Sequence, residues 1–207
     1  MEKEAGGMTM EQFVITISRE FASLGRTVAQ TLSEKLGVEF WDRDIVEAAA
    51  KRTGHSVSLV SDEEETAKSS FFLRKKDRMS LTTYNINDEI FETEKNIILD
   101  AAKKSSCIIV GRCSDYILRD FPNHLSVYIY APYEERLKNC VETLMMDEKT
   151  ARRMIREVDM ARTYYQRKYC PDIRSPRDCC DLMIDSSRFG VEGTAELIAQ
   201  ALKVLPK

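Results

Sequence analysis

The chain has 207 residues, of which 43% are apolar and 31% are charged. A chain of this length and balance buries one sizeable hydrophobic core, which excludes a disordered tail and a fibrous repeat. Its 31 Lys and Arg residues stand against 34 Asp and Glu residues, giving a net charge of -3. Overall charge therefore does not draw the protein to nucleic acid or anionic lipid, and any anion that it binds must be held by local groups.

The apolar runs are short throughout the chain. The longest, such as residues 127–131, fall far short of the roughly 20 residues that cross a bilayer. Residues 1–12, the N-terminal tail, lack the apolar core of a signal peptide. We therefore expect no membrane contact and a cytoplasmic location, where the six cysteines stay reduced. With two histidines and no C-x-x-C pair, a structural zinc site is not expected.

Strand and helix patterns alternate along the chain. Residues 13–17 form a β-branched apolar run typical of a buried strand, and apolar residues then recur at helical spacing until Gly37. The alternation continues to the end. Strands are expected at residues 13–17, 38–41, 107–110, 124–130 and 181–184, and helices at residues 28–36, 45–53, 90–102, 133–144, 148–169 and 191–202.

This order predicts an α/β fold in a single domain, with about five parallel strands and helices on both faces of the sheet. The periodicity is lost between residues 55 and 87, which we interpret as an insertion or mobile subdomain.

Polar and basic residues follow the ends of several expected strands. Ser18 and Arg19 follow the first strand, Asp42 and Arg43 the second, and Arg112 the third. In an open parallel sheet, ligands bind beyond the carboxyl ends of the strands, where loops deliver backbone N–H groups and helix N-termini to an anion. We therefore expect these residues to converge on a phosphate site.

The loop after the first strand resembles a phosphate-binding P-loop, whose pattern is G-x-x-x-x-G-K-[ST]. Gly25 stands at the second glycine, Arg26 replaces the lysine, Thr27 stands at the magnesium-ligand position, and Glu20 replaces the first glycine. The alternative is that Gly25 only lets a strand turn into a helix while the arginines are solvated. Residues expected at the ATP phosphates are Ser18, Arg19, Ala22, Ser23, Leu24, Gly25, Arg26 and Thr27.

Taken together, several motifs resemble the cytidylate kinase-like family, a divergent branch of the P-loop nucleoside monophosphate kinases. These are Ile15-Thr-Ile-Ser-Arg-Glu-Phe-Ala-Ser-Leu-Gly-Arg26, Phe40-Trp-Asp-Arg-Asp-Ile45, Ile109-Val-Gly-Arg112, Val127-Tyr-Ile-Tyr-Ala131 with Glu134-Glu-Arg136, and Leu182-Met-Ile-Asp-Ser-Ser187. The resemblance implies a three-layer Rossmann-like kinase fold. It also implies transfer of the ATP γ-phosphoryl group to a nucleoside monophosphate, CMP or dCMP in the namesake enzymes, with Mg²⁺ accompanying ATP.

The resemblance also implies roles for individual segments and residues. Residues 147–170 would form a closing lid. Residues 55–87, the insertion or acceptor-side subdomain, show no resemblance to the acceptor-binding region of the family, so base selectivity stays open. Seven Lys and Arg residues against two acidic residues give the stretch 149–168 a local charge of +5. A solvated basic helix is the alternative for this stretch. The catalytic candidates are Arg26, Arg162 and Arg167, and the acceptor-binding candidates are Asp42, Arg43, Arg112 and Asp115.

The chain departs from the family pattern at Cys113, where the namesake enzymes carry an aspartate, and Asp115 is the nearest substitute. A nucleotide-binding regulatory protein without turnover and a kinase for another small molecule are alternatives. A nucleic-acid module built on residues 152–168 is a third, which the acidic remainder of the chain disfavours. The sequence leaves a homo-oligomer open, with residues 71–73 as a candidate contact.

Overall fold

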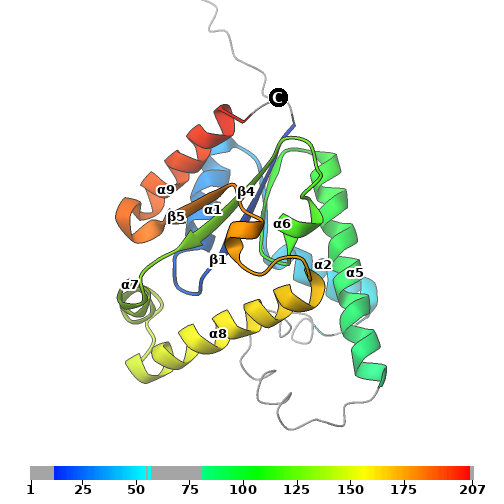
Figure 1. Ribbon diagram of the computed structural model, residues 1–207, viewed down its shortest axis with the longest axis horizontal. Helices are drawn as coiled ribbons and strands as arrows, with labels where there is room; N and C mark the ends of the chain where they lie inside the picture. Colours follow the sequence, from blue (N-terminus) through cyan, green and yellow to red (C-terminus); the bar gives the residue numbers. More distant parts are fainter. Residues whose placement is uncertain (1–11, 55, 57–80, 206–207) are drawn as a thin grey trace, which may run out of the picture.

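The computed structural model describes residues 12–54, 56 and 81–205. Its centre is a five-stranded parallel sheet with the strand order β2-β3-β1-β4-β5 (Figure 1). The α/β class and the parallel sheet expected from the sequence are therefore confirmed. The strands are β1 (Val14–Arg19), β2 (Glu39–Trp41), β3 (Cys107–Val110), β4 (His124–Tyr130) and β5 (Leu182–Asp185).

Strand β1 lies in the middle of the sheet. Its residue Thr16 stands opposite Ile109 of β3 on one side and opposite Ser126 of β4 on the other. A central parallel strand is covered on both faces, so it needs apolar residues at successive positions rather than at alternating ones. This requirement explains why a β-branched run, apolar except for Thr16, predicted the strand, although β1 extends two residues further, to Arg19.

Helices cover both faces of the sheet and give the molecule three layers. On one face α1 packs against α9, and on the other α2 packs against α5. The helices are α1 (Gly25–Leu36), α2 (Arg43–Thr53), α5 (Leu81–Lys104), α6 (Ser114–Ile117), α7 (Tyr133–Lys138), α8 (Glu148–Tyr169) and α9 (Ser186–Lys203). A π-helical turn (Asn139–Thr143) follows α7, and a 3-10 helix (Pro176–Asp178) precedes β5.

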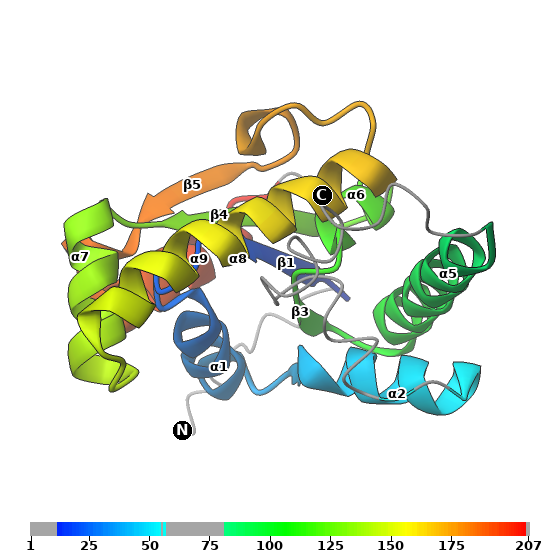
Figure 2. The ribbon, with the colours of Figure 1, turned by 90° about the horizontal axis from the view of Figure 1, so that it is seen from below.

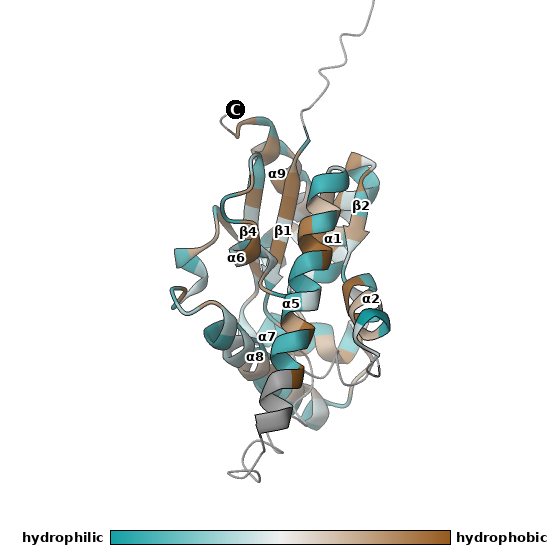
Figure 3. Cartoon of the chain, turned by 90° about the vertical axis from the view of Figure 1, so that its right-hand side faces the viewer, coloured by the Kyte–Doolittle hydropathy of each residue, from teal (hydrophilic) through white to brown (hydrophobic). Residues whose placement is uncertain are grey.

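The hydrophobic core is divided by the sheet into two clusters. One joins Ile15 of β1 to Leu32 of α1 and Ile198 of α9, and the other joins Ile45 of α2 to Ile98 of α5. All five side chains are fully buried. Figure 3 shows the corresponding pattern, with hydrophobic stretches in the strands and hydrophilic stretches along the helices.

Helix α5 begins earlier than the sequence indicates. Helical periodicity is clear only from Ile90 onward, whereas the helix starts at Leu81. Its first turns contain threonine and asparagine residues, whose modest helix propensity hides the pattern. Most of the segment 55–87, the candidate contact at residues 71–73 and residues 1–11 of the tail lie outside the described residues.

The arginine-rich segment forms one continuous helix, α8. Asp147 caps its N-terminus, because its side chain accepts a hydrogen bond from the N–H of Thr150 at 3.0 Å. Figures 1 and 2 show α8 crossing the carboxyl ends of the central strands. It therefore covers the edge of the sheet at which ligands bind in this architecture.

Among the helices that the structure describes, none has the length and apolarity that a bilayer crossing requires.

Candidate active site at the carboxyl end of the sheet

A cavity of about 280 Å³ lies between the carboxyl ends of β1 and β3 and the facing side of α8. Ser18 and Arg19 enter it from the end of β1, Arg112 from the turn after β3, Asp115 from α6 and Arg162 from α8. The structure thus brings together five residues that the sequence placed at the site, although 144 positions separate the first from the last.

The loop between β1 and α1 holds two side-chain-bearing residues in the left-handed region. Ala22 and Leu24 both have φ 60°. These are the positions at which related phosphate loops often carry glycine, and an L-residue there costs about 1–2 kcal/mol. Leu24 is the N-cap of α1, and its side chain makes no capping hydrogen bond. The first N–H groups of α1 therefore lack both an intrahelical and a capping partner, which is the condition for anion binding at a helix N-terminus.

Gly25 is required by a close approach between the loop and β1. A Cβ atom at Gly25 would lie 2.9 Å from the Cβ of Arg19, closer than two such atoms can pack. The glycine therefore allows α1 to start directly beside Arg19.

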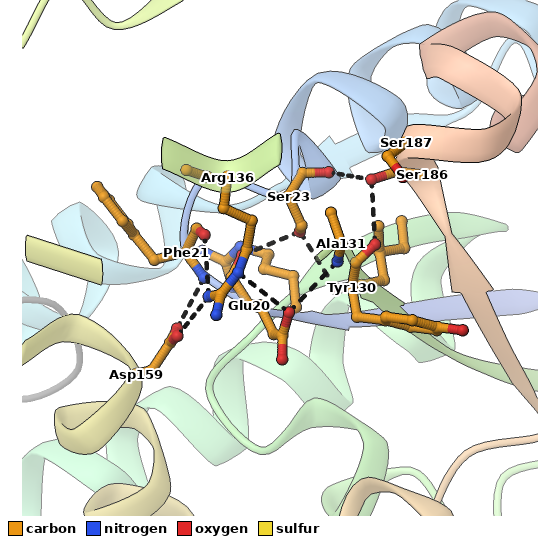
Figure 4. A network of polar contacts seen from close by, with 12 residues as sticks. Glu20, Phe21, Ser23, Tyr130, Ala131, Arg136, Asp159, Ser186 and Ser187 are labelled. Atoms are coloured by element: carbon orange, nitrogen blue, oxygen red, sulfur yellow. Dashed lines mark hydrogen bonds and ion pairs between the residues drawn. The ribbon is translucent and has the colours of Figure 1, made fainter. Parts of the chain in front are cut away.

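A polar network holds this loop from the side of α7 and α8 (Figure 4). Arg136 donates from Nη1 to the Phe21 carbonyl at 3.3 Å, and its Nε lies 3.3 Å from Oε2 of Glu20. Asp159 accepts from the Phe21 N–H at 2.8 Å and from Nη1 of Arg136 at 2.5 Å. Glu20 also accepts from the Ala131 N–H at 3.3 Å. The loop is therefore fastened to three neighbouring elements.

Two members of the loop have mainly structural side chains. Burial raises the pKa of Glu20 above its ordinary value, while the Arg136 guanidinium acts in the opposite direction. Ser23 donates its hydroxyl to the carbonyls of Glu20 and Ile129 at 2.9 Å and 3.2 Å, and its own carbonyl accepts from the Ser186 hydroxyl at 2.6 Å. Its hydroxyl therefore faces the sheet rather than a ligand.

Arg26 and Asp42 form an ion pair at the edge of the site. Nε of Arg26 lies 2.5 Å from Oδ2 of Asp42, and 55% of the Arg26 side chain is exposed. The other Asp42 oxygen lies 3.8 Å from Nη2 of Arg19. Neither Arg26 nor Asp42 nor the exposed Thr27 is among the described residues that line the cavity. Arg43 is the first residue of α2, and its side chain lies outside the described part of the structure.

Arg112 sits in an unusual turn after β3. Three successive residues, Gly111, Arg112 and Cys113, have positive φ angles of 75°, 58° and 54°. The Arg112 side chain is only 4% exposed, and its Nη1 lies 3.1 Å from Oε1 of Glu94 on α5. Strained backbone of this kind persists only where the surrounding structure holds it, and it is concentrated at functional sites.

Arg162 and Arg167 lie on different sides of α8. Arg162 donates from Nη1 to the Arg19 carbonyl at 3.1 Å and lines the cavity. Arg167 is exposed and lies on an outer surface beside Tyr164. Five residues of an α-helix correspond to a rotation of about 140°, so the two arginines cannot face the cavity together in this arrangement. The structure does not bring Arg167 to the other site candidates.

A family model of the cytidylate kinase-like family matches residues 14–188, which is most of the chain. The chain belongs to the cytidylate kinase-like family. No curated protein matches it.

Solved structures with the same fold include kinases. An uncharacterized protein from Eubacterium ventriosum ATCC 27560 is 25% identical with a TM-score of 0.70, over 93% of this chain and 99% of that one. Shikimate kinase from Acinetobacter baumannii is 15% identical with a TM-score of 0.53, over 94% and 96%. A sugar kinase from Janibacter sp. HTCC2649 is 14% identical with a TM-score of 0.55, over 95% and 97%. Family and fold together support a kinase, an enzyme of phosphoryl transfer.

Asp115 takes a defined place in this member of the cytidylate kinase-like family. It is 3% exposed, and its Oδ2 accepts from the Ser18 hydroxyl at 3.2 Å and from the Cys179 thiol at 3.3 Å. Burial raises the pKa of Cys179 far above its ordinary value, so that the thiol stays protonated and donates. The carboxylate that the sequence offered in place of the family aspartate therefore does face the cavity.

The sequence pattern did not single out four charged residues at the site. Glu94 and Asp159 lie inside long helices, where a charged residue is usually solvated. Arg136 belongs to a motif of the cytidylate kinase-like family but carried no predicted role. Arg174 lines the cavity from the segment after α8. The one sequence feature that could have indicated it is its position shortly after the basic helix.

Proposed function

We propose that this protein transfers the γ-phosphoryl group of ATP to a small anionic acceptor, with the nucleoside monophosphates CMP and dCMP as the first candidates. One observation carries the proposal: three arginines from three different elements, Arg19, Arg112 and Arg162, line one cavity beside the loop that opens α1. Phosphoryl transfer depends on positioning and on positive charge around the transferred group, and this arrangement supplies both.

The donor side of the proposed site is the loop from β1 to α1. The first N–H groups of α1 offer hydrogen bonds to ATP phosphates, and the positive end of the helix dipole favours the anion. Arg26, at the position of the P-loop lysine, is exposed and paired with Asp42. We infer that, when ATP binds, Arg26 leaves its ion pair with Asp42 and binds the ATP phosphates, since arginine binds phosphate through two parallel hydrogen bonds.

Magnesium fits the same place as a companion of ATP. Mg²⁺ takes oxygen ligands and is usually held by one or two protein groups together with substrate phosphates. Thr27 is an exposed residue in the first turn of α1, and its hydroxyl is an oxygen ligand of the kind that suits such a shared site. Among the described residues, no three His, Cys, Asp or Glu side chains form a cluster that would hold the ion alone. When bound, the ion would supply positive charge to the phosphates.

The acceptor side of the proposed site is formed by Arg112 and Asp115. Arg112 is held inside the cavity rather than in solvent, so it suits an anionic group of the acceptor. Asp115 contributes a carboxylate already oriented by Ser18. Arg162 reaches across from α8 to the Arg19 carbonyl and lines the same cavity, which makes it our candidate for contact with the transferred phosphate.

A second candidate is a nucleotide-binding protein without turnover. The ion pair between Arg26 and Asp42 and the strained residues Ala22 and Leu24 favour it, because both raise the cost of arranging the loop around phosphate. This candidate predicts ATP binding without any product.

The test is ADP release from Mg·ATP with a panel of acceptors: the ribo- and deoxyribonucleoside monophosphates, shikimate and a hexose. Products are identified by mass spectrometry, and ATP binding is measured separately by calorimetry. We expect ADP together with CDP or dCDP. Binding of ATP without product from any acceptor supports the second candidate, and no binding of ATP contradicts both.

Arginine variants connect the activity to the cavity. Arg112→Lys and Arg162→Lys keep the positive charge but lose the bidentate hydrogen bonding that arginine offers to phosphate, so we expect each to lower kcat/KM at least about tenfold. Arg153→Lys is the matched control, because Arg153 lies on the same helix as Arg162 with 58% of its side chain exposed. If the control loses as much activity as the cavity variants, the cavity is not the site of the reaction.

A further inference from the structure

Glu94 is a carboxylate buried in the middle of α5. Its side chain has 0% exposed surface, and its Oε1 lies 3.1 Å from Nη1 of Arg112. Its Oε2 accepts a hydrogen bond of 2.8 Å from the Tyr165 hydroxyl. A carboxylate withdrawn completely from water is costly unless it is paired and hydrogen-bonded, and here both conditions are met. The three residues come from three elements: α5, the turn after β3, and α8.

The contact with Glu94 fixes the direction of the Arg112 side chain. The guanidinium is planar and rigid, so the ion pair between its Nη1 and Oε1 of Glu94 restricts the orientation of the whole group. Arg112 is 4% exposed and lines the cavity from a backbone turn with positive φ. Its usefulness to an acceptor therefore depends on how Glu94 holds it.

Tyr165 connects this pair to α8. Burial raises the pKa of Tyr165 well above its ordinary value, and the nearby Glu94 carboxylate adds to the effect, so the hydroxyl stays protonated and donates. Its ring lies edge-on to Phe91 of α5 at 6.1 Å and to Tyr169 of α8 at 4.9 Å, while Phe91 and Tyr169 stack at 3.9 Å. These rings fasten the C-terminal half of α8 to α5, and a displacement of α8 would withdraw the hydroxyl from Glu94.

We propose that Glu94 is the positioning residue of the acceptor site: it holds Arg112 toward the cavity, and Tyr165 makes that orientation depend on the docking of α8. The inference rests on the proposed function only in taking Arg112 to bind an anionic group of the acceptor. It explains why a carboxylate, an arginine and a tyrosine hydroxyl are buried together beside a cavity. Acceptor affinity is then sensitive to the Tyr165 hydroxyl in particular, whereas the loop before α1, on which ATP affinity depends, is held by other residues of α8, Asp159 and Arg162.

The first experiment uses Tyr165→Phe, which removes one hydroxyl and keeps the ring packing. We expect the KM for the acceptor, and the Kd for CMP or inorganic phosphate by calorimetry, to rise about tenfold with the KM for ATP unchanged. Tyr164→Phe is the matched control, because Tyr164 is the adjacent residue on the same helix and is 57% exposed. Equal changes in the two KM values, or unchanged acceptor binding, overturn the inference.

The second experiment uses Glu94→Gln and Glu94→Asp, with Glu92→Gln on the exposed side of α5 as control. Glu94→Gln removes the negative charge that lies 3.1 Å from the Arg112 guanidinium, so we expect both lower thermal stability and weaker acceptor binding. Glu94→Asp restores the charge and is expected to recover at least part of both. If Glu94→Gln does not fold, the Tyr165→Phe result decides. If Glu94→Asp binds the acceptor as weakly as Glu94→Gln does, the positioning role is contradicted.

The failure of this inference is distinguishable from failure of the proposed function. If the wild-type protein binds CMP or phosphate but forms no product with any acceptor, the proposed function fails, and the Tyr165→Phe titration still tests the positioning role. If it binds ATP but neither CMP nor inorganic phosphate, the positioning role is overturned.

Discussion

Asp159 of α8 accepts a hydrogen bond of 2.8 Å from the backbone N–H of Phe21, in the loop between β1 and α1. The same carboxylate binds Nη1 of Arg136 at 2.5 Å. Arg162, three residues further along the same helix, donates to the Arg19 carbonyl at 3.1 Å. Residues three apart lie on one face of a helix, so one face of α8 fastens the candidate phosphate loop at two points.

Removal of the Asp159 carboxylate is expected to destabilise the protein. Asp159→Ala leaves the Phe21 N–H and the buried Arg136 without this acceptor, so we expect the free energy of unfolding to fall by about 2–3 kcal/mol. Glu148→Ala, at the exposed start of the same helix, is the control and should lose less than about 0.5 kcal/mol. Urea unfolding measures both. Equal losses would mean that the contact with the loop contributes nothing.

Addition of one methyl group at Gly25 is expected to impair nucleotide binding. The new Cβ would meet the Arg19 Cβ at 2.9 Å, so either α1 or the end of β1 must shift. We expect Gly25→Ala to weaken ATP binding at least about tenfold and to cost about 1–3 kcal/mol of stability. Gly37→Ala is the control, because Gly37 has φ +66° but no neighbouring atom within 4 Å. It should cost about 1 kcal/mol from backbone strain and leave ATP binding intact. Similar ATP affinities of the two variants would contradict this prediction.

The sheet was predictable from the sequence because each strand is short and contains a group of apolar residues. Residues 107–110 and 124–130 match β3 and β4 at both ends: β3 is wholly apolar, and β4 is mostly apolar with Ser126 as a buried polar residue inside it. The four-residue helix α6 has no apolar stripe, and the start of α5 at Leu81 lacks strong helix formers. Tertiary packing rather than local propensity determines both, so neither could be read from the pattern.

The site was predictable where its residues follow strand ends and not where they lie inside helices. Ser18, Arg19 and Arg112 were found because parallel strands end at one edge of the sheet. Glu94 and Asp159 were missed because their burial depends on which face of a helix meets the loop or the turn, and a charged residue in a polar helix gives no sign of this. Arg26 lies in the first turn of α1, before the expected start of the helix at residue 28, and its ion pair with Asp42 depends on a contact between the starts of α1 and α2 that spacing does not encode.

Glycine at position 22 is expected to relieve strain in the loop. Ala22 has φ 60°, where an alanine costs about 1–2 kcal/mol and a glycine pays only its chain entropy, about 0.5–1 kcal/mol. We therefore expect Ala22→Gly to leave stability unchanged or to raise it by about 0.5 kcal/mol. Ala29→Gly is the matched control, because Ala29 is fully buried inside α1. There the same substitution should cost about 1 kcal/mol or more. Urea unfolding measures the difference between the two variants, and equal losses of stability at both positions would show that Ala22 is not strained.

His124 is expected to make stability fall as the solution is acidified below pH 6.5. Burial lowers the pKa of His124 from its ordinary value of 6.5, although the Asp181 and Asp115 carboxylates act in the opposite direction. Above pH 6.5 the histidine is neutral in both the folded and the unfolded chain. Below pH 6.5 the unfolded chain takes up the proton first. The free energy of unfolding therefore falls as the pH approaches the lowered pKa of the folded protein, by no more than about 1.4 kcal/mol per pH unit.

The variant His124→Gln separates this effect from the titration of the carboxylates. It removes the ring whose Nε2 lies 2.7 Å from the buried Thr16 hydroxyl, so some stability is lost at every pH. What matters is the slope: urea unfolding between about pH 7.5 and pH 5.5 should show a shallower decline for the variant than for the wild type. Parallel declines would mean that His124 titrates alike in the folded and unfolded chains, and that its burial at the start of β4 does not oppose its protonation.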